Sequence, residues 1–300
     1  MNTILVTGAT GFIGSHLIKR LRESGEKVIS LIHDEPIWTT WLTEALGGTV
    51  LIRGDIRDFN LLKRVLVNYE VDRCVHLASQ AIVSHAYKDP VNTFDINVLG
   101  SIKLLEACRQ VGVKYVICQS TDKCYGNQKG ATVESRLIPT EPYSASKIAM
   151  DIAAQSFIET YGQKICITRC CNVYGYDPSN RRIVPNTVKD CLSNRQPIIY
   201  KDDKSARQYI FIHDVTRTFM ELMENKMTGV VNIATDTVLT QEAIVLTILR
   251  YFPELKPKYV EKPELKEITS QSMIPDYPRK YTPFEDGIKL TIDAFRKWGF

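Results

Sequence analysis

The feature that most constrains the fold is the segment T-G-A-T-G-F-I-G at residues 7–14, which joins an apolar strand-like run to an amphipathic helix-like run. Gly8 permits a tight turn, Gly11 lets the backbone approach a pyrophosphate, and Gly14 lets the helix pack closely on the strand. The N-terminus of such a helix points free N–H groups and a partial positive charge at bound phosphates. The segment therefore predicts a dinucleotide-binding turn, and a glycine-rich turn without a ligand is the alternative.

Strand-like and helix-like segments alternate through the first half of the chain. Continuous apolar runs predict strands at residues 3–7, 27–32, 48–55, 73–78, 114–119 and 164–169. Further patterns predict helices at residues 12–24, 58–69, 90–111 and 142–161. Apolar strands that alternate with helices are typical of a parallel sheet covered on both faces. We therefore predict an α/β fold, a Rossmann-type doubly wound parallel sheet with a smaller C-terminal substrate-binding region.

An acidic residue follows the second predicted strand, in the sequence His33-Asp34-Glu35. In a dinucleotide-binding fold an acid at about this distance from the glycines binds the ribose hydroxyls, and Asp34 is our choice. Since no arginine follows directly to hold a 2′-phosphate, NAD is favoured over NADP. Asp55 and Ala78 end the next two predicted strands, and we expect both to line the same crevice.

The pattern changes after about residue 170, where prolines become frequent and strand-like runs shorten. We expect residues 1–170 to form the NAD-binding domain and residues 171–300 to form mainly the substrate-binding region. The apolar run at residues 229–235 is expected to join the main sheet.

Composition excludes several classes of protein. The 300 residues carry 38 basic and 34 acidic side chains, so the net charge of 38 − 34 = +4 is too small to indicate a nucleic-acid partner. No apolar run is long enough to span a bilayer, and the first residues do not resemble a signal peptide. Eight cysteines lie mostly in apolar runs without zinc-site spacing. We therefore expect a cytoplasmic protein with buried, reduced cysteines, no metal and no membrane contact.

Tyr143 and Lys147 lie four residues apart on a predicted helix, which places them on one face. A tyrosine has a pKa near 10 and is a poor base at neutral pH. A cation at about 4 Å is worth on the order of 4 kcal/mol at an effective dielectric of 20, or about three pKa units. We therefore expect Lys147 to lower the pKa of Tyr143 until Tyr143 can act as a base.

T-G-x-x-G-x-x-G with Y-x-x-x-K, over nearly the whole chain, resembles the extended short-chain dehydrogenase/reductase family of nucleotide-sugar enzymes. Four other segments resemble that family: HLASQ at 76–80, DPVNTFDINVLG at 89–100, RCCNVYG at 169–175 and SARQYIFIHDV at 205–215. The resemblance implies that Asn172 and Arg207 hold the sugar-nucleotide pyrophosphate, that Asn97 shapes the active-site backbone, and that Thr121 joins the catalytic set. It also implies a homodimer built from the helices predicted at 90–111 and 142–161.

The residues after Ser120-Thr121 distinguish reactions within this family. The sequence S-T-D-K at 120–123 resembles most closely that of the CDP-glucose 4,6-dehydratases. In that reaction Tyr143 takes the C4 hydroxyl proton while the C4 hydride passes to NAD⁺, the C5 hydrogen and the C6 hydroxyl leave, and the hydride returns to C6. We assign Asp122 as the acid at C6 and Lys123 as the base at C5. The alternative is that Lys123 anchors substrate or pairs with Asp122, and the two titrate as one coupled system.

The candidate site residues fall into three groups. The candidate catalytic residues are Thr121, Asp122, Lys123, Tyr143 and Lys147. The candidate cofactor-binding residues are Gly8, Gly11, Phe12, Ile13, Gly14, Asp34, Asp55, Ile56, Leu77, Ala78, Ser79, Asn97, Tyr143 and Lys147. The candidate substrate-binding residues are Gln80, His85, Thr121, Asn172 and Arg207.

The sequence therefore predicts an NAD-dependent nucleotide-sugar 4,6-dehydratase with CDP-glucose as the favoured substrate. A 4-epimerase of the same fold is one alternative, and a dehydratase acting on UDP-N-acetylglucosamine, TDP-glucose or GDP-mannose is another. A non-catalytic NAD-binding relative is a third, which the presence of Thr121, Tyr143 and Lys147 disfavours.

Overall fold

Seven strands of the described chain form one parallel sheet. The computed structural model describes residues 2–33, 36, 39–179, 182–261, 270–277 and 279–300. The strands are β1 (Thr3–Thr7), β2 (Lys27–Ile32), β3 (Val50–Arg53), β4 (Arg73–His76), β5 (Tyr115–Thr121), β6 (Ile165–Cys170) and β10 (Gly229–Ile233), in the order β10-β6-β5-β4-β1-β2-β3. Each neighbouring pair is parallel. This arrangement confirms the predicted Rossmann-type doubly wound sheet.

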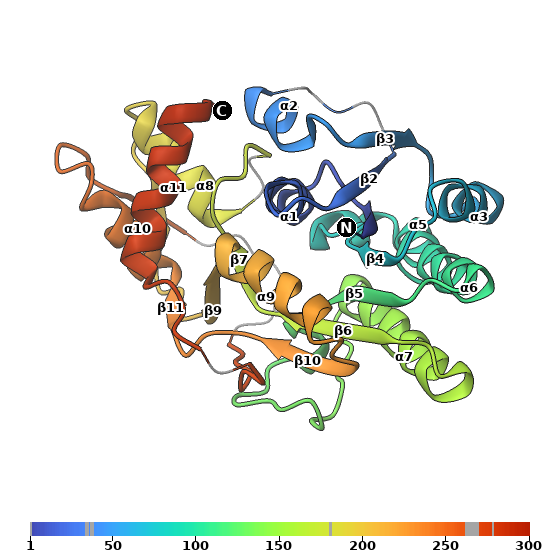
Figure 1. The fold of residues 1–300 in the computed structure, drawn as a ribbon. Coiled ribbons are helices and arrows are strands. Elements are labelled where there is room, and N and C mark those ends of the chain that lie inside the picture. The colour runs from blue at the N-terminus through green and yellow to red at the C-terminus, as the bar shows by residue number, and fades with distance from the viewer. Residues whose placement is uncertain (1, 34–35, 37–38, 180–181, 262–269, 278) are drawn as a thin grey trace.

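Helices cover both faces of the sheet, as Figure 1 shows. On one face lie α1 (Phe12–Glu23), α2 (Thr40–Leu46) and α9 (Ile212–Glu224). On the other lie α3 (Phe59–Asn68), α6 (Ser101–Val111) and α7 (Pro142–Tyr161). Each face has its own cluster of buried apolar side chains. The strand order reverses beside β1, which is where such sheets bind ligands at the carboxyl ends of their strands.

The later part of the chain adds short strands and helices beside the carboxyl edge of the main sheet (Figure 1). Its elements are β7 (Asn172–Tyr174), α8 (Ile183–Leu192), β8 (Ile198–Tyr200), β9 (Ala206–Phe211), β11 (Val238–Thr240), α10 (Gln241–Leu249), β12 (Lys258–Val260) and α11 (Phe284–Trp298). Strands β7 and β11 flank β9, and β8 pairs with β12. Strand β10 returns to the main sheet and pairs with β6.

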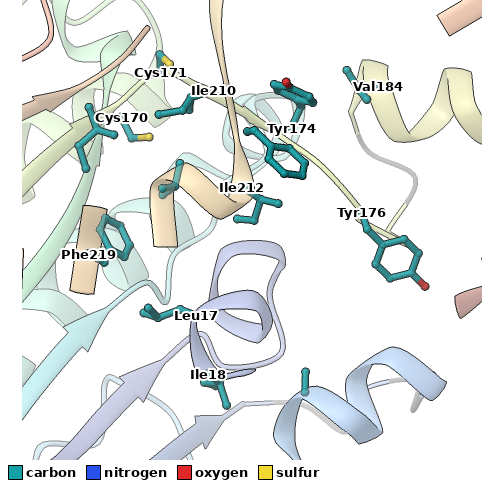
Figure 2. Packing of buried hydrophobic residues seen from close by; sticks show 14 of the residues in the cluster. Leu17, Ile18, Cys170, Cys171, Tyr174, Tyr176, Val184, Ile210, Ile212 and Phe219 are labelled. Atoms are coloured by element: carbon teal, nitrogen blue, oxygen red, sulfur yellow. The ribbon is translucent and has the colours of Figure 1, made fainter. Parts of the chain in front are cut away.

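The core of the first face continues into this later part. Figure 2 shows Leu17 and Ile18 of α1 and Phe219 of α9 in one cluster with Tyr174 of β7 and Ile210 of β9. All five side chains are buried. One apolar core therefore joins the sheet to the later elements, and close packing fixes the two parts against each other.

The helix predicted at residues 90–111 is not regular. It consists of α5 (Pro90–Phe94), a π-helical turn η1 (Asp95–Gly100) and α6, and it follows the short helix α4 (Val83–Lys88). A π-helical turn widens the helix by one residue per turn and often marks a functional site. Strands β3 and β4 also end earlier than predicted, so that Asp55 and Ala78 lie in the loops that follow them.

Among the described residues, no helix combines the length and the apolarity needed to cross a bilayer. The eight cysteines are all buried and unpaired, as the sequence predicted.

Candidate active site

A cavity of about 1080 Å³ lies at the carboxyl ends of the sheet strands and extends to the later elements. Most of the predicted site residues line it. They are Gly8, Gly11, Phe12, Ile13, Gly14, Asp55, Ile56, Leu77, Ala78, Ser79, Gln80, Thr121, Asp122, Lys123, Tyr143, Lys147, Asn172 and Arg207. Asn97 lies behind the wall, His85 is exposed on α4 away from the cavity, and Asp34 lies outside the described residues.

The glycine turn has the tight geometry that its sequence predicted. Gly8 has a φ of +68°, and a Cβ there would lie 2.8 Å from the backbone nitrogen of Ala78. A Cβ on Gly14 would lie 2.2 Å from the carbonyl oxygen of Gly8. The residue before α1, its N-cap Gly11, provides no side-chain cap, so the N–H groups of the first helical turn have no side-chain acceptor at the cavity. This uncapped positive end suits an anionic phosphate.

A chain of buried hydrogen bonds holds the ends of β1 and β4. Ser101 Oγ donates to the carbonyl of Asn97 at 2.7 Å, so it accepts from His76 Nε2, also at 2.7 Å. His76 Nδ1 then accepts from Thr7 Oγ1 at 2.8 Å, and burial lowers the pKa of His76 to about 3. The same Thr7 oxygen accepts from the backbone N–H of Ala78. The imidazole is therefore neutral, with its proton on Nε2, and it fixes the loop that lines the cavity.

Asn97 fixes the next part of that loop. Its side-chain oxygen accepts from the backbone N–H of Gln80 at 2.7 Å, and its nitrogen donates to the Gln80 carbonyl at 3.0 Å. The same nitrogen donates to Ser146 Oγ on α7 at 2.9 Å. Asn97 thus joins the π-helical turn, the loop after β4 and the helix of Tyr143. In this structure Asn97 positions the backbone and does not line the cavity.

The carboxylate of Asp55, at the edge of the cavity, is hydrogen-bonded to neighbouring side chains. Arg57 donates to both its carboxylate oxygens, at 3.0 Å from Nε, and His33 Nε2 lies 3.0 Å from Oδ2. The Arg57 guanidinium holds the pKa of Asp55 down to about 2. Asp55 is therefore ionised, and its carboxylate is held in one orientation at the cavity edge.

Asp122 begins a 3-10 turn, η2 (Asp122–Tyr125), directly after β5. Thr121 caps that turn: its hydroxyl oxygen accepts from Lys123 N at 3.3 Å and donates to Asp122 Oδ1 at 3.0 Å. The carboxyl group of Asp122 is buried, and burial raises its pKa, while Lys123 and the Thr121 hydroxyl act in the opposite direction. The site therefore holds an acid whose proton is more strongly bound than that of an ordinary aspartate.

Tyr143 and Lys147 lie one turn apart on α7, as predicted, and both are buried. Burial raises the pKa of Tyr143, and a hydrogen bond with Thr121 lowers it by less. Lys147 donates to the backbone carbonyl of Gln119, and burial lowers its pKa. In the unliganded chain burial thus holds the pKa of Tyr143 above its ordinary value. That Lys147 lowers this pKa stays a prediction.

The two residues predicted for the substrate pyrophosphate line the same cavity from strands of the later part. Asn172 on β7 donates to the Gln208 carbonyl at 3.2 Å, and Arg207 on β9 lowers the pKa of Asp122 by its charge. The sequence analysis missed Gln119 and Cys170, which line the cavity at the ends of β5 and β6. The signal was present, because the ends of neighbouring parallel strands meet at one edge.

The model of the NAD dependent epimerase/dehydratase family matches residues 4–234. Among curated proteins, the dTDP-D-glucose 4,6-dehydratase of Dictyostelium discoideum is 30% identical over 254 residues, which are 78% of this chain and 58% of that protein. A trifunctional UDP-glucose 4,6-dehydratase of Arabidopsis thaliana is 27% identical over 99% of this chain and 48% of its own length. The chain thus spans about half the length of these curated relatives.

Two solved structures are similar over nearly their whole length. The UDP-glucose 4-epimerase of Thermotoga maritima, solved with UDP-glucose, has a TM-score of 0.89 and 27% identity, covering 98% of this chain and 99% of that one. The dTDP-glucose 4,6-dehydratase of Streptomyces venezuelae, solved with NAD, has a TM-score of 0.87 and 28% identity, covering 98% and 97%. The fold is thus shared by proteins named for two different reactions.

Proposed function

The chain belongs to the NAD dependent epimerase/dehydratase family, and from this premise we propose that it is a nucleotide-hexose 4,6-dehydratase. Its substrate is a nucleotide hexose, and its product is the corresponding 4-keto-6-deoxy sugar. The reaction removes a hydrogen from C5 and the hydroxyl from C6, so it needs an acid and a base beyond those that act at C4.

The observation that carries this proposal is the buried carboxyl group of Asp122. It lines the cavity directly after β5, next to Lys123 and Thr121, and burial raises its pKa. A carboxyl group with a raised pKa can deliver a proton to a leaving hydroxyl. A reaction confined to C4 has no use for this proton.

NAD is the cofactor of the family, and the cavity fits it. The glycine turn leaves room for a pyrophosphate at the uncapped end of α1, and Asp55, Ile56, Leu77, Ala78 and Ser79 continue along the same wall. Bound NAD⁺ would supply a hydride acceptor at C4 and a hydride donor at C6. The ribose-binding role of Asp34 stays a prediction.

Each proton transfer of the reaction is assigned to a different side chain of the site. Tyr143 takes the proton of the C4 hydroxyl, and the Thr121 hydroxyl stabilises the phenolate by a hydrogen bond. Lys123 removes the C5 proton, and the electron pair of that C–H bond forms the C5–C6 double bond. Asp122 protonates the C6 oxygen as the C6–O bond breaks, so that one water leaves. The C6 position would then receive the hydride, and Lys123 returns a proton to C5, which completes the 4-keto-6-deoxy sugar.

We infer the nucleotide from the sequence alone. The sequence S-T-D-K favours CDP-glucose, whereas the named relatives are dTDP- and UDP-glucose enzymes. We test five substrates with the purified protein and NAD⁺: CDP-glucose, TDP-glucose, UDP-glucose, UDP-N-acetylglucosamine and GDP-mannose. Loss of one water from any of them supports the proposal, and Asp122→Asn is expected to abolish that loss.

A 4-epimerase is the second candidate, because the Thermotoga maritima epimerase matches the fold as well as the dehydratase does. Thr121, Tyr143 and Lys147 serve C4 chemistry in either reaction. In the same assay an epimerase gives a C4 epimer of unchanged mass, and Asp122→Asn leaves its rate nearly unchanged.

We also propose a homodimer in a reducing, cytoplasmic setting. Exposed apolar side chains lie on α5, η1 and α7 although these helices flank the active site, and they are Val91, Phe94, Leu99, Ile152 and Tyr161. A second copy of the same face would bury them. The eight unpaired cysteines fit a reducing compartment. Light scattering gives twice the chain mass for the dimer, and Leu99→Lys reduces it to the monomer.

A further inference from the structure

Arg182 is a cation of the later part of the chain, and it lines the same cavity as the glycine turn. It lies directly before α8, and the carbon Cζ of its guanidinium is 5.2 Å from the centre of the Phe12 ring. Phe12 is the first residue of α1 and also lines the cavity. A segment far away in the sequence therefore places a positive charge beside the first turn of α1.

Two contacts hold this guanidinium. Its Nη1 donates to Oδ2 of Asp177, whose buried carboxylate also accepts from the backbone N–H of Ser179 at 3.0 Å. Its position over the Phe12 ring is that of a cation–π contact. Within the described part of the chain, the other N–H groups of the guanidinium donate to no acceptor, and the side chain is 39% exposed. Arg182 is thus held through one nitrogen and keeps further donors for an anion.

The Phe12 side of this contact is fixed as well. The Phe12 ring meets the His16 ring edge-on, with 5.5 Å between the centroids, and His16 Nε2 lies 2.9 Å from the carbonyl oxygen of Tyr176. Burial lowers the pKa of His16 to about 3, so the imidazole is neutral and donates its Nε2 proton to this carbonyl. The segment that carries Asp177 and Arg182 is therefore joined to α1 at two points.

The first turn of α1 is the place where the pyrophosphate of a dinucleotide is expected. Its N–H groups lack a side-chain cap, because the N-cap residue is Gly11. The end of a helix provides a partial charge of only about half a unit, which is less than the charge of a diphosphate. A guanidinium offers a full charge and a planar set of donors that matches phosphate oxygens. Arg182 therefore supplies at this turn what the backbone does not.

We propose that Arg182 binds the pyrophosphate of the cofactor, so that the later part of the chain contributes a side chain to the NAD site. This inference rests on the proposed function in one respect, the binding of NAD in this cavity. A reaction that regenerates its cofactor in each turnover has no need to release it. A cation from a second part of the chain slows the release of NAD, because the contact must break before the cofactor leaves.

The test follows the fluorescence of NADH as it binds the full chain, and as ADP or adenosine displaces it. Arg182→Met removes the cation, and we expect the Kd values of NADH and ADP to rise about 10–100-fold. The Kd of adenosine, which has no phosphate, stays unchanged and shows that the variant is folded. Arg250→Met is the matched control, since Arg250 is exposed at the end of α10 and does not line the cavity. Its three Kd values equal those of the wild type.

The cavity is also expected to hold the pyrophosphate of the substrate, and a second measurement separates the two. Calorimetry with UDP and with CDP in saturating NAD⁺ is expected to give equal Kd values for wild type and Arg182→Met. Weaker binding of UDP or CDP with unchanged binding of ADP would overturn the proposal and assign Arg182 to the substrate.

Equal affinity of wild type and Arg182→Met for ADP would also overturn the proposal. Arg182→Gln is the second variant if the methionine variant does not fold, and the same rise in the Kd of ADP is expected. None of these measurements needs turnover. A protein that proves to be an epimerase therefore refutes the proposed function and still gives a result for Arg182.

Discussion

Arg169 and Asp151 form an ion pair in which both side chains are buried, with Arg169 Nε 2.9 Å from Asp151 Oδ2. Asp151 lies on α7 one turn beyond Lys147, and Arg169 lies on β6. Arg169 also donates to the hydroxyl of Tyr125, the last residue of the turn that begins with Asp122, at 2.8 Å. The pair therefore joins the helix of the proposed base to the turn of the proposed acid.

Because both charges are buried, we expect removal of one partner to lower the free energy of unfolding more than removal of both. Arg169→Met leaves a buried carboxylate unpaired and is expected to lower the free energy of unfolding by about 3–5 kcal/mol. Asp151→Leu together with Arg169→Met removes both charges and recovers most of that loss. Urea unfolding measures all three proteins. Arg195→Met, from the exposed pair with Asp190, is the control and changes stability by less than about 1 kcal/mol. Equal losses in the single and double variants would contradict this account of the pair.

The glycine turn predicts that Gly8 is needed for close backbone approach, beyond its backbone conformation. Gly8→Ala combines a positive φ with contacts of 2.8 Å to the loop after β4, and we expect it to abolish NAD⁺ retention and lower the melting temperature. Gly25→Ala is the matched control, since Gly25 has a φ of +82° and nothing within 4 Å of the added Cβ. For Gly25→Ala we expect the free energy of unfolding to fall only by the cost of the left-handed conformation, about 1–2 kcal/mol. This variant is expected to keep its bound NAD⁺. Retention of NAD⁺ by Gly8→Ala would contradict the proposal that this turn binds the pyrophosphate.

Two buried histidines predict acid lability. Burial lowers the pKa values of His16 and His76 from 6.5 to about 3. Between these pH values the unfolded chain binds more protons than the folded chain, so the free energy of unfolding falls as pH falls through this window. At pH 5.5 each histidine contributes a loss of about 1.4 kcal/mol. Urea unfolding from pH 7 to pH 4 measures the slope, which His16→Asn is expected to reduce by one proton. An unchanged slope would show that His16 is protonated in the folded protein.

If Lys123 is the base at C5, its removal should slow proton exchange at that carbon. Lys123→Met removes the proposed base, so the rate of deuterium incorporation at C5 of the product in D₂O falls by about 10²–10⁴-fold. Lys129→Met, at an exposed position in the same loop region, is the control and keeps the wild-type rate. Normal incorporation in Lys123→Met would leave Lys123 as a partner of Asp122 or of the substrate.

The parts of the site that the sequence predicted are those set by local spacing. The glycine turn follows from three residues between a strand and a helix, and the common face of Tyr143 and Lys147 follows from helical spacing. Asp122 and Lys123 lie at the cavity because parallel strands end at one edge.

The remainder depends on burial and on contacts between distant segments. The raised pKa of Tyr143 follows from its desolvation in the folded chain, which helical spacing does not report. The π-helical turn around Asn97 is similarly hidden, because its residues are ordinary helix residues.

The central claim is that Asp122 and Lys123 turn C4 oxidation into loss of water across C5 and C6. The measurement that tests it most directly is the mass and deuterium content of the product formed from the accepted nucleotide hexose in D₂O. The account predicts a 4-keto-6-deoxy product that has lost one water and carries deuterium at C5. A C4 epimer of unchanged mass without deuterium at C5 would contradict it.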